Sequence, residues 1–381
     1  MMRIVLPTGI FPPDIGGPAS YVPRIAAALA ARGHAVEVVT LADDPAAGGE
    51  FSFPVRRIRR GMARIPRMIR TVATIRQWAR SADLIYANGL FIEAAIAAAL
   101  ARKPLVMKIV GDWAWERAYN QRATDLPPAE FNRARLSLRW ELIKRLRTLV
   151  TRQAARIIVP SDFLKHLLGE WPVEEARIAV IHNALDPLPA SVPPPGPPFR
   201  GFTLVTASRL IRLKNIAAII RLVAARKDIR LVIIGTGPEG GNLRQIAMDA
   251  GASDRVIFTG DLDGARLRGW LEASHLFVLN SIHEGLPHVI LECFQAGVPV
   301  LATAVGGVPE LIRHGGNGWL IPPCDEEALR MAVDGLLADA NLRKTLIAGG
   351  ALRLRMAFTL DAMVTGTECI LRAALEKGLT E

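Results

Sequence analysis

The chain has 381 residues, of which 50% are hydrophobic and 22% are charged. This composition is typical of folded domains and excludes a disordered protein, and the length predicts two domains or three. The three cysteines, Cys293, Cys324 and Cys369, are far apart and odd in number, which excludes a disulfide framework and a CxxC metal site and suits a reducing compartment. The net charge of +11 favours nucleic acid, an anionic membrane or an acidic small molecule as a partner.

The charge is concentrated in the first half of the chain. Residues 1–190 hold 27 Lys and Arg against 17 Asp and Glu, whereas residues 191–381 hold 20 against 19. The two halves are therefore expected to meet different partners. No targeting segment is evident, and the apolar run at residues 94–101 is too short to span a bilayer. We expect a cytoplasmic protein, attached at most peripherally to the inner face of the cell membrane.

Short β-rich runs alternate with helical patterns along the whole chain, which predicts an α/β fold with parallel sheets built from βαβ units. Strands are expected at residues 3–6, 35–41, 55–58, 84–86, 105–109, 156–159 and 178–181, and then at 203–206, 230–234, 256–258, 276–279, 300–302 and 318–321. Helices are expected between them, for example at residues 20–32, 93–101, 215–225, 242–250 and 288–296.

A proline-rich segment at residues 186–201 divides these two series of elements. Proline lacks the backbone donor and favours extended conformations, so the segment is predicted to be a semi-rigid linker. It separates an N-terminal domain at residues 1–185 from a C-terminal domain at 202–358, and a final helix at 359–381 could cross back to the first domain. Two doubly wound, Rossmann-like domains would bind a ligand in the cleft between them, in loops after the strand carboxyl ends.

Two helical patterns in the first half are strongly basic. One, at residues 65–79, has an apolar stripe surrounded by arginines that include Arg64, Arg67, Arg70 and Arg76, and the other covers residues 133–156. Three interpretations remain open: a solvated helix face, a surface for anionic lipid, and a nucleic-acid surface. No nucleic-acid-reading motif accompanies the charge, so we expect no nucleic-acid partner.

Several loops carry groups that suit a phosphate. Gly16 and Gly17 follow the first strand and precede a helix, where backbone N–H groups can approach an anion. Arg209 and Lys214 follow the first strand of the second domain, beside a helix start. Gly235 begins a G-x-G-x-x-G sequence, but at the second strand of its domain and with Pro238 in the turn, which argues against a dinucleotide site.

The most informative segment is Glu284–Glu292, with the sequence EGLPHVILE. Pro287 is expected in the first turn of a helix, which places Glu284 before the helix and Glu292 inside it, so that the two carboxylates address different parts of one ligand. The pair Asp261 and Asp263 resembles a metal-binding DxD, but hard-cation sites usually need further oxygen ligands, and we expect no metal.

Taken together, these features resemble the family 4 retaining glycosyltransferases with the GT-B fold. The resemblance covers nearly the whole chain, including residues 183–186, 306–310 and 317–318. It implies that Arg209 and Lys214 hold the donor diphosphate, with the Gly17 backbone closing over it. Glu284 would hydrogen-bond hydroxyls of the transferred sugar, and Glu292 would bind the ribose. The loop residues Gly285, Leu286 and Pro287 would also contact the donor. Residues 259–264 would border the base. The family needs neither a divalent metal nor another cofactor.

The sequence departs from the family in one loop. Family members often carry a histidine after the fifth strand, near the anomeric carbon, whereas this loop reads VGDWAWER at residues 110–117. Asp112 is the best replacement by position, and Glu116 is the next. Trp113 and Trp115 could stack on a sugar or on a lipid-linked acceptor, or one of them could belong to the core.

These observations predict a retaining glycosyltransferase that moves a sugar from a nucleotide-sugar to a hydroxyl acceptor. The LP pair within the Glu284–Glu292 segment favours a UDP-sugar over a GDP-sugar. The acceptor is expected to be a lipid-linked saccharide or an oligosaccharide, in surface polysaccharide or glycolipid synthesis. A nucleotide-sugar epimerase of similar architecture and a non-catalytic nucleotide- or nucleic-acid-binding protein are the alternatives.

Overall fold

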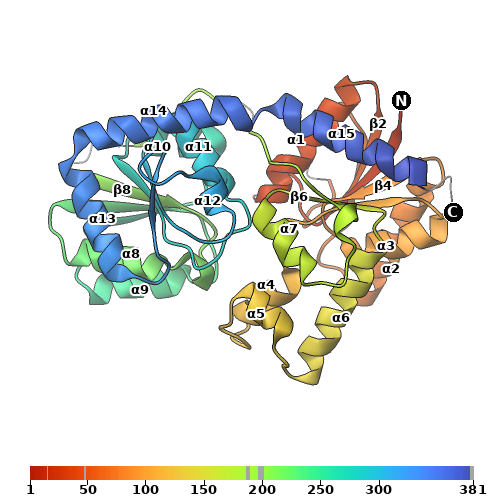
Figure 1. Ribbon diagram of the computed structural model, residues 1–381, viewed down its shortest axis with the longest axis horizontal. Coiled ribbons are helices and arrows are strands. Elements are labelled where there is room, and N and C mark those ends of the chain that lie inside the picture. The colour runs from red at the N-terminus through yellow and green to blue at the C-terminus, as the bar shows by residue number, and fades with distance from the viewer. Residues whose placement is uncertain (15, 47–48, 186–188, 196–200, 378–381) are drawn as a thin grey trace. The chain divides into compact units, whose positions relative to one another are not determined.

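The computed structural model describes residues 1–14, 16–46, 49–185, 189–195 and 201–377, and it divides into two compact α/β units (Figure 1). One unit comprises Met1–Asn183 together with the C-terminal helix α15 (Leu360–Lys377), and the other comprises Ala184–Thr359. Residues 186–188 and 196–200 of the expected linker lie outside the described residues.

The N-terminal unit is built on a seven-stranded parallel sheet with the order β3-β2-β1-β4-β5-β6-β7. Its strands are β1 (Arg3–Thr8), β2 (Ala35–Ala42), β3 (Val55–Arg59), β4 (Leu84–Ala87), β5 (Leu105–Lys108), β6 (Arg156–Val159) and β7 (Ile178–Val180). Its other helices are α1 (Gly17–Ala31), α2 (Arg64–Ala79), α3 (Phe91–Ala101), α4 (Trp113–Asn120), α5 (Pro128–Arg133), α6 (Leu138–Arg152), α7 (Asp162–Gly169) and the 3-10 turn η1 (Glu175–Arg177).

The C-terminal unit has a six-stranded parallel sheet with the order β10-β9-β8-β11-β12-β13. The strands are β8 (Phe202–Ala207), β9 (Ile229–Ile234), β10 (Val256–Gly260), β11 (Leu276–Leu279), β12 (Val300–Thr303) and β13 (Trp319–Ile321). The helices are η2 (Arg212–Lys214), α8 (Ile216–Ala224), α9 (Gly240–Asp249), α10 (Gly264–Glu272), α11 (His288–Ala296), α12 (Val308–Leu311), α13 (Glu326–Ala338) and α14 (Ala340–Ala357).

Both sheets are covered by helices on both faces, which explains why strands such as β11 are apolar at every position and fully buried. In the N-terminal unit α2, α3 and α6 lie on one side of the sheet, and α1 and α15 lie on the other (Figure 1). Helix α15 is bound to α1 through Arg32, which donates to Asp361 at 2.5 Å and to Thr365 at 2.9 Å and also pairs with Glu368. Hydrogen bonds from Arg372, Arg32 and His34 lower the pKa of Glu368 to about 2.

The composition of the basic segment at residues 133–156 predicted one continuous helix, and this prediction was wrong. Helix α5 ends at Arg133, and α6 begins only at Leu138, after Ala134 adopts an extended conformation. The carboxylate of Glu141 accepts a hydrogen bond from the backbone N–H of Leu136, which closes this connection. Helix α6 also ends earlier than predicted, because Arg156 belongs to β6.

Candidate active site

The candidate site of the C-terminal unit lies where the strand order reverses, between the neighbouring strands β8 and β11. Loops at such a switch point leave the sheet in opposite directions and open a crevice at the strand carboxyl ends. Lys214 follows β8 at the end of η2, and Glu284 follows β11. Lys214 Nζ lies 2.5 Å from Glu284 Oε1, and Ser281 Oγ lies 2.6 Å from the same oxygen.

The two loops are also joined through their backbones. The N–H of Ile282 donates to the carbonyl oxygen of Leu213 at 2.8 Å, and Asn280 Nδ2 donates to the carbonyl oxygen of Asn215 at 3.2 Å. Asn215 has a φ of 45° and is the N-cap residue before α8, so the chain turns sharply after Lys214. These contacts hold Lys214 and Glu284 in a defined arrangement.

Glycines allow neighbouring loops to approach this arrangement closely. A Cβ on Gly306 would lie 1.7 Å from the carbonyl oxygen of Glu284, and Gly306 has a φ of +55°. The next residue, Gly307, donates its N–H to the carbonyl oxygen of Gly285 at 3.0 Å. The loop after β12 therefore supports the loop that carries Glu284, a contact that only glycine permits.

Gly235 has a comparable packing role. A Cβ added at Gly235 would lie 2.1 Å from the carbonyl oxygen of Ser208. A Cβ added at Gly237 would lie 2.4 Å from the carbonyl oxygen of Leu210. The N–H of Leu210 in turn donates to the carbonyl oxygen of Thr236 at 2.8 Å. The G-x-G sequence thus packs the loop after β9 against the loop that carries Arg209, which is exposed while Leu210 is buried.

The Glu284–Glu292 segment divides between loop and helix. Pro287 precedes the first residue of α11 as its N-cap, one position earlier than expected, and Glu292 is half-buried within the helix. Leu286 is buried and packs in the core of the C-terminal unit. Burial lowers the pKa of His283, beside Glu284, to about 4, so this imidazole is neutral at pH 7.

The two aspartates of the DxD sequence have separate structural partners. Asp261 accepts a hydrogen bond from Thr236 Oγ1 at 2.6 Å, whereas Asp263 caps α10 by accepting from the N–H of Arg266 at 2.9 Å. Among the described residues, no group of three or more His, Cys, Asp or Glu side chains is arranged to hold a metal ion.

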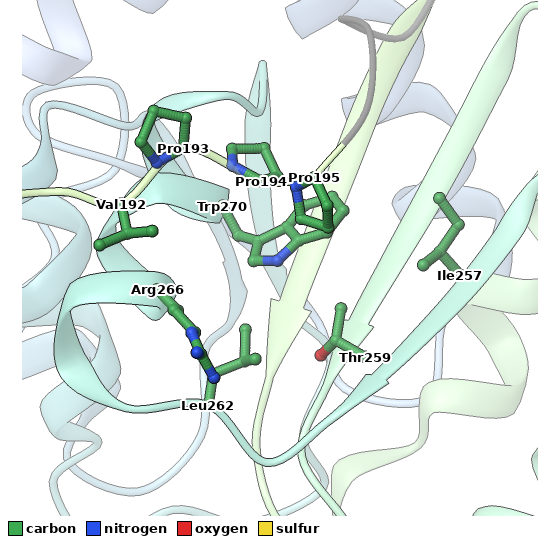
Figure 2. A pocket seen from close by; sticks show the side chains of 9 residues that line it. All are labelled: Val192, Pro193, Pro194, Pro195, Ile257, Thr259, Leu262, Arg266 and Trp270. Atoms are coloured by element: carbon green, nitrogen blue, oxygen red, sulfur yellow. The ribbon is translucent and has the colours of Figure 1, made fainter.

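A cavity of about 530 Å³ lies elsewhere in the C-terminal unit (Figure 2). Prolines 193–195 form one wall, and Ile257, Thr259, Leu262 and Trp270 contribute to the rest. The proline segment is held along α10, because the N–H of Val192 donates to the carbonyl oxygen of Ala265 at 3.0 Å and Gly269 leaves room for the Val192 backbone. Thr259 and Leu262 belong to the segment 259–264 that was expected near the base, although Thr259 lies in β10, whereas Arg209, Lys214 and Glu284 do not line this cavity.

The N-terminal unit has its own switch point, between β1 and β4. Gly16 is the N-cap of α1, with a φ of 147°, and a Cβ on Gly17 would meet no atom within 4 Å, so the first turn of α1 is open to an approaching group. Sequence reasoning missed Gly89, whose Cβ would lie 2.8 Å from the backbone nitrogen of Gly9. Gly89 lets the loops after β1 and β4 meet, and its position two residues after β4 was the available signal.

Asp112 has a structural environment. It is fully buried, its Oδ1 caps α4 by accepting from the N–H groups of Ala114 and Trp115, and its Oδ2 lies 2.5 Å from Arg147 Nη1. Both carboxylate oxygens are therefore engaged, which favours a structural role over the expected catalytic one. Trp115 is buried and donates to the carbonyl oxygen of Leu126 at 2.8 Å, so it belongs to the core, whereas Trp113 is half-buried.

The arginines predicted on α2 fall into two groups. Arg64, Arg70 and Arg76 are exposed. Arg67 is half-buried and donates to the carbonyl oxygen of Arg60 at 2.6 Å, so it anchors the start of the helix.

Comparison with known proteins identifies the family. Residues 15–187 match the sequence model described as Glycosyltransferase Family 4, and residues 195–353 match the one described as Glycosyl transferases group 1. The lipopolysaccharide core biosynthesis glycosyltransferase LpsD of Rhizobium meliloti (strain 1021) is 30% identical over 246 residues, which cover 65% of this chain and 71% of LpsD. LpsE of the same organism is 32% identical over 187 residues, 49% of this chain and 52% of LpsE.

Solved structures show the same architecture. HepE of Anabaena, in complex with UDP and glucose, superposes with a TM-score of 0.79 at 21% identity, covering 98% of this chain and 100% of HepE. WaaG, a glycosyltransferase involved in lipopolysaccharide biosynthesis, gives a TM-score of 0.69 at 17% identity, covering 96% and 99%. The fold is therefore GT-B, and the chain belongs to the group 1 glycosyltransferases of family 4.

Proposed function

We propose that this transferase moves a sugar from a nucleotide-sugar, preferably a UDP-sugar, to a hydroxyl group with retention of anomeric configuration. The observation that carries the proposal is the Lys214–Glu284 pair at the switch point of the C-terminal sheet. A cation beside a carboxylate suits a ligand in which a diphosphate is joined to a polyhydroxylated ring. HepE, which shares the fold, forms complexes with UDP and UDP-glucose.

In this proposal Lys214 and Arg209 bind the diphosphate. Negative charge grows on the distal phosphate as its bond to the sugar breaks, and a preorganised cationic or N–H donor in a dry site contributes about 3–4 kcal/mol to transition-state stabilisation. Glu284 accepts hydrogen bonds from sugar hydroxyls, Glu292 binds the ribose, and the open first turn of α1 at Gly16 and Gly17 offers N–H groups to phosphate. A phosphate oxygen takes the acceptor proton, so the reaction needs no protein base, and Lys214 and Arg209 neutralise the diphosphate in place of a divalent metal.

We further propose a lipid-linked saccharide or an oligosaccharide as the acceptor, in the synthesis of a surface polysaccharide or glycolipid. The names of LpsD and LpsE, which belong to lipopolysaccharide core biosynthesis, support this part of the proposal. An acceptor with a lipid portion would be met at the membrane surface, where peripheral attachment of the enzyme would be an advantage.

The test is release of nucleoside diphosphate from a panel of UDP- and GDP-sugars, with lipid-linked and free oligosaccharide acceptors. Lys214→Ala is expected to lower kcat/KM about 100- to 1000-fold, as for loss of one oxyanion-stabilising donor. The control is Lys227→Ala, at an exposed lysine of the same unit. Equal turnover in Lys214→Ala would overturn the phosphate assignment. NMR of the product would reject retention if the configuration were inverted, and would reject transfer if an epimer formed without an acceptor.

A further inference from the structure

Helix α6 places its leucines outside and two cations inside. The side chains of Leu138, Leu142, Leu146 and Leu149 are between 40% and 75% exposed, and their spacing places them on one face of a helix with about 100° per residue. Lys144 and Arg147 on the opposite face are buried. Trp140 and Val150 are buried on the inner side as well, so the unusual feature of α6 is that its four leucines face outward while two cations are buried.

The inner contacts lock α6 in this orientation. Lys144 Nζ pairs with Glu141 at 2.7 Å and donates to the carbonyl oxygen of Ala134 at 2.7 Å. Arg147 pairs with buried Asp112 and lies over the ring of Trp171, with its guanidinium carbon 3.9 Å from the ring centroid. Rolling the helix to bury its leucines would separate these buried charges, at a cost of several kcal/mol for each ion left unpaired. The exposed leucines are therefore a fixed feature of the unit.

The neighbouring helices also carry exposed apolar residues. Helix α3 contacts both α6 and α2, and the three helices cover the same side of the sheet (Figure 1). Ile96 and Leu100 are exposed on α3, and Ile65 and Ile69 are exposed on α2. We call the exposed side of α2, α3 and α6 the basic apolar face. Scattered exposed apolar residues are ordinary on a protein surface, but four leucines on one face of α6, with further apolar residues on two adjacent helices, are a candidate interaction site.

Charge on this face selects the partner. Arg145 and Arg152 border the leucines of α6 on one side and Arg139 borders them on the other, and all three arginines are exposed. On α2, exposed Arg76 follows Ile65 and Ile69 on the same helix face. The three helices contain only two acidic residues, Glu93 and Glu141, of which Glu141 pairs with Lys144. An anionic lipid surface complements leucines bordered by arginines, because the acyl chains take the leucines while the headgroups bind the guanidinium groups.

We propose that the basic apolar face docks on an anionic lipid bilayer, with the α6 leucines inserted at the boundary between headgroups and acyl chains. The bilayer proposal rests on the proposed function for the lipid-linked acceptor. It deepens that function by naming the protein surface that would bring the enzyme to the acceptor. Attachment would be interfacial: within the described ranges, no helix is both long and apolar enough to cross a bilayer.

The experiment is sedimentation of the full chain with vesicles of phosphatidylglycerol and phosphatidylcholine. Wild type is expected to sediment with these vesicles and not with phosphatidylcholine alone. Leu142→Ser/Leu149→Ser should weaken binding at least about 10-fold, since two inserted side chains are lost. Met248→Ser/Met331→Ser, in the C-terminal unit, is the matched control, because these methionines are 56% and 61% exposed against 54% and 61% for the two leucines. The control should bind as wild type does.

The charge is tested separately with Arg145→Gln/Arg152→Gln. This variant should bind the anionic vesicles more weakly and with less dependence on salt, whereas Lys344→Gln/Arg355→Gln, with the same change in net charge at exposed sites of α14, should bind as wild type does. Wild type that stays in the supernatant at low salt would overturn the proposal, as would equal losses in the controls. A stable dimer that the leucine substitutions dissociate would assign the face to a second copy of the chain instead.

Turnover separates this inference from the proposed function. The leucine variant should release nucleoside diphosphate at the wild-type rate with a water-soluble acceptor, because no residue of the candidate site is changed. Vesicle binding without any transfer in wild type would contradict the proposed function alone, and transfer without vesicle binding would contradict the bilayer proposal alone.

Discussion

Lys214 Nζ lies 2.5 Å from Glu284 Oε1, although 70 residues separate the two along the chain. The side chains are 18% and 9% exposed, so water screens their attraction only in part. In the proposed function the pair has two roles: the ammonium group binds the diphosphate, and the carboxylate orients that ammonium group and accepts hydrogen bonds from the sugar.

Glu284→Gln should separate these roles. The amide keeps the shape of the side chain but loses the charge, so we expect kcat/KM for the sugar donor to fall at least about 10-fold, while affinity for the free nucleoside diphosphate stays equal or rises because Lys214 no longer pairs with a carboxylate. Steady-state kinetics and titration calorimetry measure the two quantities. Glu327→Gln, which removes an exposed ion pair with Arg330, is the control. A parallel loss of nucleotide affinity would show that Glu284 acts mainly by supporting the loop.

Gly306→Ala should destabilise the loop that carries Glu284. The new Cβ would lie 1.7 Å from the Glu284 carbonyl oxygen, and the residue would keep a φ of +55°. We expect a loss of at least about 3 kcal/mol in unfolding free energy, because backbone must move in addition to the left-handed strain. Gly315→Ala, with a φ of +73° and no atom within 4 Å of the Cβ, isolates the strain, at about 1–2 kcal/mol. Equal losses in urea denaturation would contradict the close-approach argument.

Asp112→Asn tests whether Asp112 is structural or catalytic. The amide oxygen can still cap α4, but buried Arg147 would lose its charged partner, so we expect the unfolding free energy to fall by about 3–5 kcal/mol. Glu170→Gln, which removes an exposed pair with Arg133, should leave the unfolding free energy close to that of wild type. A stable Asp112→Asn protein with turnover reduced by orders of magnitude would instead assign Asp112 to catalysis.

The free energy of unfolding of the N-terminal unit should rise with pH because of buried Lys108. Its amine is buried 4.2 Å above the ring centroid of Tyr21 and has no hydrogen-bond partner among the described residues. Burial lowers its pKa from 10.5 to about 7, so between these values the unfolded state binds more protons and stability rises with pH. The gain is lost as pH falls toward 7.

Lys108→Met should remove this dependence and raise the unfolding free energy near pH 7 by about 2–4 kcal/mol, because methionine fills a similar volume without a charge. Denaturation at several pH values between 6 and 10, followed by circular dichroism, measures the effect. Lys227→Met, at an exposed lysine, serves as the control. An unchanged pH profile in Lys108→Met would show that the amine is hydrated in solution.

Local pattern predicted most of the secondary structure. The strand at residues 276–279 and the helix at 288–296 have the predicted bounds, since a short apolar run bounded by polar residues and a proline beside a helix start are local signals. The main error was the prediction of one helix at residues 133–156. The helical spacing of the basic residues continues across the turn between α5 and α6 and so hides that turn. Only the backbone conformation of Ala134 shows where the first helix of the segment ends, whereas the strand at residues 156–159 was predicted with its observed bounds.

By itself, the sequence determined which residue types stand at the strand ends and that the two halves repeat one fold. The tertiary structure decided which of them meet. Lys214 contacts Glu284 because β8 lies beside β11, an order that no local pattern encodes. Likewise, periodicity shows that α6 has an apolar and a charged face, but not which face is buried. The Asp112–Arg147 pair decides which face is buried. Leaving a buried ion without its partner costs more free energy than leaving leucines exposed at the surface.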